Sequence, residues 1–520
     1  MINMSKNVKR LMTSRELSLE VIYNVLENGE YLKESIDSVI SKNGVTDARD
    51  RAFISVLADG TVERKIELDY IINKYSSKRT EKLKPYIRNI LRMTVYQIKY
   101  MDRVPDNASV DEAVKLAVKK GYGGLRGYVN GVLRNIARTY QDIKYPDLES
   151  EPVKYFSVMY SMPEWMVEHF INELEKDGFG QDKSDKGTFE RDKYEKNGWK
   201  TEKKETDELA RSLEYFLAKP ELTVRPGKIS REAVSELADE LNNAGLITSQ
   251  GQIFDYAVRI ESPGRVEDIP GYSAGKFVVQ DESSMIPAHV IAAYISSQND
   301  AKTAFIKDSV ITEANVSVEH GSGSAGRLKL LDMCAAPGGK ALHAASLLGS
   351  MAEIEARDVS DAKTSMIRAN IERLGIDNIT VRRADALVRN ENDREKYDII
   401  IADLPCSGLG VISKKPDIKY NADAKGLAGL ASIQSDILDN AAVYVKRGGI
   451  IVYSTCTVNR GENEDNCRAF LDRHPEFAQV NLKSFVPESI MDSVDEFGNI
   501  KILPGKYKSD GFFVAMFRRR

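Results

Sequence analysis

Two cysteines follow directly after apolar, β-branched runs of the chain. The run 397–404 leads through Pro405 to Cys406, and the run 450–455 ends at Cys456. Such runs are typical of buried parallel strands, whose carboxyl ends open onto one crevice. The pattern therefore predicts two thiols close together, beside Asp403 at the end of the first run.

Paired thiols beside a carboxyl group suit one demanding reaction, the methylation of a carbon atom in cytosine. A thiolate that adds to C6 turns the ring into an enamine, whose C5 can attack an activated methyl group such as the sulfonium methyl of S-adenosylmethionine. The reaction needs a thiolate, an acid near N3 and a base that removes the C5 proton. Cys456, Asp403 and Cys406 can supply these three roles.

A glycine-rich turn precedes these residues in the chain. Its sequence is Cys334-Ala335-Ala336-Pro337-Gly338-Gly339-Lys340. Small residues let a ligand approach the backbone, and the N-terminus of a following helix attracts negative charge. The turn fits neither a Walker A loop nor a GxGxxG fingerprint. It could hold a nucleotide-like cofactor, and the alternative is a tight turn between a strand and a helix.

Three acidic residues are predicted at the ends of successive strands. Asp358 ends the second strand of this part of the chain, Asp385 the third and Asp403 the fourth. An acid at the first of these positions can accept hydrogen bonds from ribose hydroxyls. Each aspartate alone could be a helix N-cap. Together, beside the glycine-rich turn, they are better explained by a shared ligand.

The other two cysteines have no predicted chemistry. Cys334 lies in the turn, where the backbone should matter more than the thiol, and Cys467 is expected to pack inside a helix. None of the four cysteines forms a CxxC or Cys/His array, which argues against a disulfide framework and against a metal site. Free thiols favour a reducing cytosol.

The chain of 520 residues is too long for one hydrophobic core. Residues 1–143 are predicted as an all-α bundle, and 144–276 as a connector with a small α+β domain and a mobile charged insertion at 181–207. Residues 277–520 alternate strands and helices, which predicts an α/β Rossmann-like domain with a parallel sheet. A loose insertion is expected at 296–326.

The net charge of −4 is distributed unevenly. Residues 1–140 carry 25 Lys and Arg against 17 Asp and Glu, which suggests either a nucleic-acid partner or a solvated helical surface. Individual residues such as Arg15, Arg88 and Arg134 are interpreted as surface or helix-capping charges. The chain has no apolar run of about 18 residues and no secretory signal, so we expect a cytoplasmic protein without a membrane partner.

The N-terminal blocks resemble a known RNA-binding family. The segments RELSLEVIYNVL, DRAFISVLADGTVERKIELDYII, IRNILRMTVYQIKYMDRVPDNASVDEAVKLA and YVNGVLRNI look like the NusB family of antitermination factors. That resemblance implies RNA binding on a basic helical surface.

Six later blocks resemble the RNA cytosine-C5 methyltransferase family. They are LLDMCAAPGGK, EARDVS, RRADAL, DIIIADLPCSGLGVISKKPDIKY, IVYSTCTVNRGENEDN and KILPGKYKSDGFFVAMF. The resemblance implies that Cys456 is the nucleophile and that Cys406 acts in product release. It also implies an S-adenosyl-L-methionine site at Cys334–Lys340, Asp358, Asp385 and Asp403.

Because the chain also has NusB-like N-terminal blocks, it most resembles one branch of that family, the bacterial enzymes of the ribosomal small subunit (RsmB, also called Sun or Fmu). This branch implies methylation of a cytosine in 16S ribosomal RNA by a monomer that acts on unassembled RNA or an early particle. One alternative is the same chemistry on tRNA or another RNA. A further alternative is a non-catalytic RNA-binding or antitermination factor.

Overall fold

The computed structural model describes residues 12–176, 203–218, 221–262, 264–298 and 327–520. The chain divides into two compact units. The first comprises Met1–Leu217 with Ile412–Asn421, and the second comprises Ala218–Val411 with Ala422–Arg520. The predicted insertions at 181–207 and 296–326 lie outside the described residues except at 203–207 and 296–298. These two ends belong to helices, so that part of the prediction was wrong. The predicted division into three domains stays a prediction.

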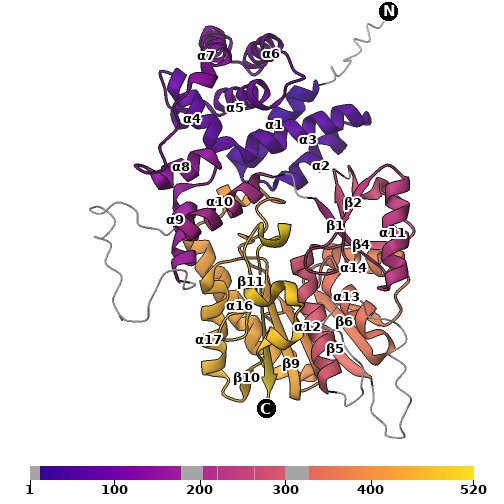
Figure 1. Cartoon of the computed structure of the whole chain (residues 1–520). Coiled ribbons are helices and arrows are strands. Elements are labelled where there is room, and N and C mark those ends of the chain that lie inside the picture. The colour runs from indigo at the N-terminus through magenta and orange to yellow at the C-terminus, as the bar shows by residue number, and fades with distance from the viewer. Residues whose placement is uncertain (1–11, 177–202, 219–220, 263, 299–326) are drawn as a thin grey trace, which may run out of the picture. The chain divides into compact units, whose positions relative to one another are not determined.

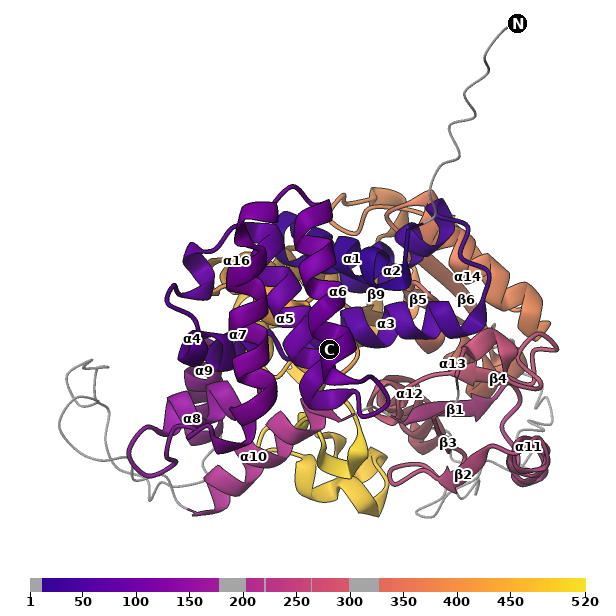
Figure 2. The ribbon, with the colours of Figure 1, turned by 90° about the horizontal axis from the view of Figure 1, so that it is seen from above.

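The first unit is helical, as predicted, and its helices can be followed in Figure 2. Its helices are α1 (Ser14–Asn28), α2 (Leu32–Lys42), α3 (Ala48–Glu63), α4 (Lys65–Tyr75), α5 (Pro85–Tyr100), α6 (Asp106–Lys119), α7 (Arg126–Thr139), α8 (Pro152–Met159), α9 (Glu164–Lys176) and α10 (Lys203–Leu217). Helix α1 begins with a capping box in which Thr13 is the N-cap and Glu16 Oε2 accepts a hydrogen bond from the Thr13 N–H.

A short segment from the second half of the sequence completes the first unit. Helix α15 (Ile418–Asn421) carries Lys419, which is buried and donates from Nζ to the Glu63 carbonyl oxygen at 2.7 Å. The Tyr420 hydroxyl donates to the Val62 carbonyl oxygen at 2.9 Å. The segment thus satisfies the last carbonyl groups of α3, which have no partner within that helix.

The second unit begins with a small antiparallel sheet. Its strand order is β2-β3-β1-β4, with β1 (Leu222–Pro226), β2 (Ile247–Gln250), β3 (Val258–Glu261) and β4 (Phe277–Val279). Helix α11 (Arg231–Asn243) contacts β1 and β2 and closes a small core around Val224 and Phe277. This confirms the small α+β element expected before the large sheet.

The large sheet has the order β10-β12-β9-β8-β5-β6-β7, with β11 paired to β12. Its strands are β5 (Leu328–Asp332), β6 (Ala352–Asp358), β7 (Ile379–Arg383), β8 (Tyr397–Asp403), β9 (Val445–Thr455), β10 (Phe477–Gln479), β11 (Ile500–Ile502) and β12 (Phe512–Arg519). Strands β5 to β9 pair in parallel, whereas β12 pairs antiparallel with β9. The predicted Rossmann-like domain is confirmed, and β10 is a strand that the sequence pattern did not indicate.

Helices cover both faces of the large sheet (Figure 1). Alternate side chains of each strand point to opposite faces. Ile399 and Ile401 pack toward α12 (Glu282–Gln298), α13 (Gly339–Leu348) and α14 (Asp361–Leu374), whereas Ile400 packs toward α16 (Ala424–Tyr444) and α17 (Glu464–Arg473). Because these strands are buried on both faces, their sequences are continuous runs of apolar residues. Within the described ranges, no helix is both long and apolar enough to cross a membrane.

Candidate active site

The two predicted thiols lie side by side. Strands β8 and β9 are parallel neighbours, and Asp403 is paired in register with Ser454. The chain continues past these strand ends to Cys406 and Cys456, whose Sγ atoms are 3.2 Å apart. The contact with Cys456 and burial raise the pKa of the Cys406 thiol well above its usual value. Cys406 is therefore held as a neutral thiol that can donate toward Cys456.

Glu462 connects the loop that follows β8 and carries Cys406 with the loop that follows β9 and carries Cys456. The sequence analysis assigned no role to this residue. Its Oε1 accepts hydrogen bonds from Ser407 Oγ at 2.6 Å and Asn459 Nδ2 at 2.9 Å. Its Oε2 accepts from the Ser407 N–H and from Gln434 Nε2, both at 2.9 Å. The carboxyl group is fully buried. The motif ENE, quoted in the family resemblance, was the available signal for this residue.

Asp403 lies between two hydrogen-bond donors. Lys340 Nζ donates to Asp403 Oδ2 at 2.6 Å, and Ser454 Oγ donates to Oδ1 at 2.7 Å. Burial opposes the charge on Lys340, but the Asp403 carboxylate raises the pKa of the lysine above its usual value. The structure thus links the glycine-rich turn to the strand that carries the first cysteine.

The glycine-rich turn is held against the end of β6. Gly338 adopts a left-handed backbone conformation with φ of 108°, which favours glycine, and α13 starts at the next residue. The Ala336 N–H donates to Asp358 Oδ2 at 3.0 Å. Two of the predicted ligand-binding elements therefore lie in direct contact.

Asp332 is a second acidic residue that sequence reasoning missed. It ends β5 directly before the turn, and both of its carboxyl oxygens are buried without a hydrogen-bond partner among the described residues. Burial, with a further contribution from Asp403, raises its pKa to about 7. A buried carboxyl group without a partner is costly and points to a ligand that supplies a donor.

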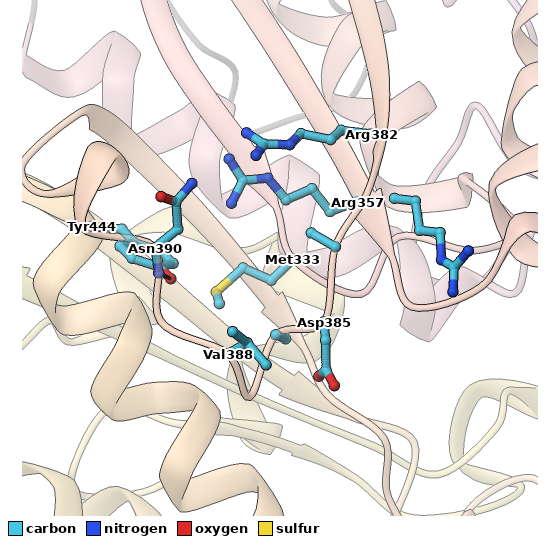
Figure 3. Close-up of a pocket in the computed structure, with 10 residues that line it drawn as sticks. Met333, Arg357, Arg382, Asp385, Val388, Asn390 and Tyr444 are labelled. Atoms are coloured by element: carbon cyan, nitrogen blue, oxygen red, sulfur yellow. Dashed lines mark hydrogen bonds between the residues drawn. The ribbon is translucent and has the colours of Figure 1, made fainter.

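Asp385 lies in the loop that follows β7. Strand β7 ends at Arg383, so the prediction that Asp385 ends this strand was wrong, and Asp385 Oδ1 accepts from the Leu387 N–H of its own loop at 3.0 Å. The residue borders a cavity of about 240 Å³. Figure 3 shows its carboxyl group on the far side of this cavity from the Arg382 guanidinium.

The remaining cysteines have the structural surroundings expected of them. Cys467 is buried beside Phe470 in the core under α16 and α17, which confirms the packing prediction. Burial raises the pKa of the Cys334 thiol well above its usual value, which favours its neutral form. Within the described part of the chain, no group of three or more His, Cys, Asp or Glu side chains is arranged to hold a metal ion.

The basic residues named from the helical unit differ in their surroundings. Arg88 is an ion-pair partner of Glu27 in a partly buried contact, so its interpretation as a surface or capping charge was wrong. Arg15 donates from Nε to Gln97 Oε1 at 2.8 Å. Arg134 is half exposed and donates to Asn130 Oδ1 of its own helix at 2.9 Å, which agrees with a surface charge.

The fold and this arrangement define a Rossmann-like methyltransferase domain in a chain that also carries a NusB-like helical domain. Residues 325–518 match the family model described as 16S rRNA methyltransferase RsmB/F, and residues 12–138 match that of the NusB family. A protein described as probable ribosomal RNA small subunit methyltransferase B from Bacillus subtilis (strain 168) is 31% identical over 508 residues, which cover 97% of this chain and 98% of that protein.

A protein with the same description from Synechocystis is 28% identical over 513 residues, covering 98% of this chain and 100% of that protein. A crystal structure titled PH0851 has the same fold, with a TM-score of 0.67, 20% identity and coverage of 97% of this chain and 98% of that chain. The chain belongs to the 16S rRNA methyltransferase RsmB/F family. It is an RNA methyltransferase, and its methyl donor is S-adenosyl-L-methionine.

The residues around the turn fit this cofactor. The unpaired Asp332 carboxyl can accept from the ammonium group of its methionine part, and Asp358 can accept from ribose hydroxyls. A side chain at Gly338 would be strained by the backbone conformation. Residues 332–340 and Asp358 thus offer acceptors that suit a nucleoside with an amino-acid tail.

Proposed function

We propose that this protein methylates C5 of a cytosine in 16S ribosomal RNA through a covalent adduct between a cysteine and C6. The observation that carries the proposal is the pair of thiols 3.2 Å apart beside Asp403. Methylation at an oxygen or an exocyclic nitrogen needs no thiol nucleophile. Methylation at C5 does, because this carbon becomes nucleophilic only after C6 is attacked.

The surroundings of the thiols support unequal roles. Cys406 keeps its proton, because burial and Cys456 raise its pKa. Cys456 is therefore the nucleophile that attacks C6, and Cys406 hydrogen-bonds to it. Once C5 carries the methyl group, Cys406 donates its proton to Cys456 Sγ as that sulfur leaves C6, and the Cys406 thiolate so formed takes up the C5 proton.

Asp403 and Lys340 act at N3 of the cytosine ring. As C6 is attacked, electron density moves onto N3, which must receive a proton or a hydrogen bond. Asp403 provides it in its protonated form: the carboxyl proton passes to N3, and the Lys340 ammonium 2.6 Å away stabilises the carboxylate that remains. When bound, S-adenosylmethionine supplies the electrophilic methyl group that C5 takes up.

The substrate assignment rests on the relatives of this chain and on its helical domain. Relatives that align over nearly the whole chain are described as ribosomal RNA small subunit methyltransferase B. The target cytosine must be unstacked to reach a buried thiol, which costs less in a loop than in a duplex. The helical domain binds the RNA, which is unassembled or part of an early particle, and the protein acts as a monomer in the cytoplasm.

Bisulfite mapping tests the substrate directly. Ribosomal RNA from cells with and without the protein is compared, and the loss of one 5-methylcytosine in 16S RNA is expected. If 5-methylcytosine were lost only from tRNA, tRNA would be the substrate of the same reaction. An unchanged map, with no labelled methyl transferred to any RNA by the pure protein, would favour a non-catalytic RNA-binding factor.

A further inference from the structure

A continuous line of hydrogen bonds runs from the small sheet to Asp403. Arg225 Nε donates to Gln280 Oε1 at 2.8 Å, and Gln280 Nε2 donates to the Ser284 carbonyl oxygen at 2.9 Å. The Ser284 hydroxyl accepts from Lys340 Nζ at 3.1 Å, and the same ammonium donates to Asp403 Oδ2 at 2.6 Å. All five residues belong to the second unit.

We propose that Gln280 and Ser284 are positioning residues that hold the Lys340 ammonium against the Asp403 carboxyl group. This inference rests on the proposed function, because it assigns the line of hydrogen bonds a part in cytosine methylation. Neither residue is among the groups given a role in the reaction above. Both act through Lys340.

The first argument is the flexibility of lysine. Its side chain loses up to about 2 kcal/mol of rotamer entropy when it is fixed. An ion pair with Asp403 alone fixes the distance between the charges but leaves the ammonium free to swing around the carboxyl group. The Ser284 hydroxyl is a second acceptor on another element, α12, and two acceptors define the direction of the ammonium.

The second argument is the rigidity of the segment that carries Ser284. Successive side chains before it are each held by a different part of the unit. Asp281 accepts from Ser283 Oγ at 2.8 Å and from the Asp510 N–H at 3.2 Å. Glu282 accepts from the Ile253 N–H at 2.6 Å and pairs with Arg259 at 2.8 Å. The start of α12 is therefore a fixed platform for Ser284.

The third argument is the burial of Arg225, which begins the line of hydrogen bonds at the end away from Asp403. Arg225 is fully buried, and its hydrogen-bond partners are neutral: Gln280, the Pro226 carbonyl at 3.3 Å and Ser346 Oγ at 3.4 Å. Burial lowers its pKa to about 9. Its Nη2 also reaches the Gly339 carbonyl oxygen at 3.5 Å, one residue before Lys340. A buried cation is costly, and this one fixes both the Gln280 side chain and the backbone beside Lys340.

Replacement of Ser284 by alanine is the direct test. Ser297→Ala is the matched control, since Ser297 is exposed on the same helix and its hydroxyl bonds only to neighbours in the chain, donating to the Tyr294 carbonyl oxygen and accepting from Gln298 Nε2. We expect Ser284→Ala to lower kcat for methyl transfer to a small-subunit rRNA transcript about 10-fold, with both KM values within about twofold of wild type. Ser284→Thr, which keeps a hydroxyl, should recover most of the rate.

One further readout separates positioning from a general loss of structure. Without the Ser284 hydroxyl, the Lys340 ammonium loses one of its two acceptors and should react faster with an acylating reagent, measured at that residue by mass spectrometry. Gln280→Leu should lower kcat and raise the reactivity of Lys340 to a smaller extent.

Unchanged kcat and an unchanged reactivity of Lys340 in Ser284→Ala would overturn the inference while wild-type methylation stands. A loss of rate that Ser284→Thr fails to recover would overturn it as well. Failure of the proposed function gives a different pattern. In that case the wild-type protein methylates no cytosine, yet Lys340 still reacts faster in Ser284→Ala than in Ser297→Ala.

Discussion

Cys406 Sγ and Cys456 Sγ are 3.2 Å apart although 50 residues separate them in the sequence. The parallel pairing of β8 with β9 brings them together, because it places Asp403 opposite Ser454 and so aligns the loops that follow. Hydrogen bonds from both loops to Glu462 then fix the two thiols relative to each other.

The first prediction separates the roles of the two thiols. Cys406→Ala should accumulate a covalent protein–RNA adduct that survives a denaturing gel, because attack at C6 proceeds but release is blocked. Cys456→Ala should form no adduct and should lose methyl transfer by at least about 10³-fold, as is usual for a missing nucleophile.

Cys467→Ala is the control for this pair, because Cys467 is a buried packing residue in α17. It should form no stable adduct and should retain methyl transfer. An adduct of equal yield in Cys406→Ala and Cys456→Ala would refute the assignment of roles.

The second prediction concerns Glu462. Glu462→Ala leaves the donors on Ser407, Gln434 and Asn459 without a buried acceptor, which should lower the free energy of unfolding by about 2–4 kcal/mol. Glu462→Gln keeps the shape but turns one acceptor into a donor, and should cost about 1–3 kcal/mol. Chemical denaturation measures both changes.

Both Glu462 variants should also lower kcat more than they raise either KM, because the thiols lose their fixed separation. The control is Glu476→Gln, an exposed glutamate in the second unit. A Glu462→Gln protein with wild-type stability and wild-type kcat would show that this carboxyl group does not hold the cysteine loops.

The sequence allowed the strands that carry the site to be predicted because they are buried on both faces and therefore apolar throughout. Asp403, Cys406 and Cys456 follow from those strands, since register in a parallel sheet aligns strand ends. The hydrogen-bond partners of these residues could not be predicted. Glu462, Ser284 and Gln280 lie far from them in the sequence or on other elements, and only the folded chain shows which donor meets which acceptor.

Tertiary contacts that local sequence does not show also explain where the predicted elements differ from the observed ones. The strand β7 ends at Arg383, where the chain leaves the sheet, and Asp385 accepts a hydrogen bond within its own loop. The strand β10 has only three residues, too few to show an alternating pattern. The assignment of 412–421 to the helical unit follows from long-range contacts that local sequence does not encode.

The third prediction follows from the buried Asp332 carboxyl group. Its pKa is raised to about 7 in the folded chain, from an ordinary value near 3.8. A raised pKa means that the folded state prefers the protonated form. The contribution of Asp332 to stability is therefore complete below about pH 4 and is lost as the pH rises through about 7. Asp332→Asn should remove this loss and raise the unfolding temperature at pH 8.

Asp332→Asn should also weaken S-adenosylmethionine binding, measured by calorimetry, by about 10-fold or more, because a charged acceptor is replaced by a neutral amide. Asp472→Asn, an exposed site on α17, is the control and should change neither quantity. If Asp332→Asn instead lowered the unfolding temperature at pH 8, the carboxyl group would have a partner in the folded chain, and this argument would be refuted.

The fourth prediction concerns Lys419 in the helical unit and has the opposite sign. Burial lowers the pKa of Lys419 to about 7, although its Nζ donates to the Glu63 carbonyl oxygen. A lowered pKa means that the folded state prefers the neutral amine. The contribution of Lys419 to stability is present above about pH 10 and is lost as the pH falls through about 7. Lys419→Met should therefore flatten the dependence of the unfolding temperature on pH between 7 and 10.

Lys415→Met is the control, because Lys415 is exposed in the same segment, and it should leave that dependence unchanged. An equal effect of the two variants would contradict the role assigned to burial.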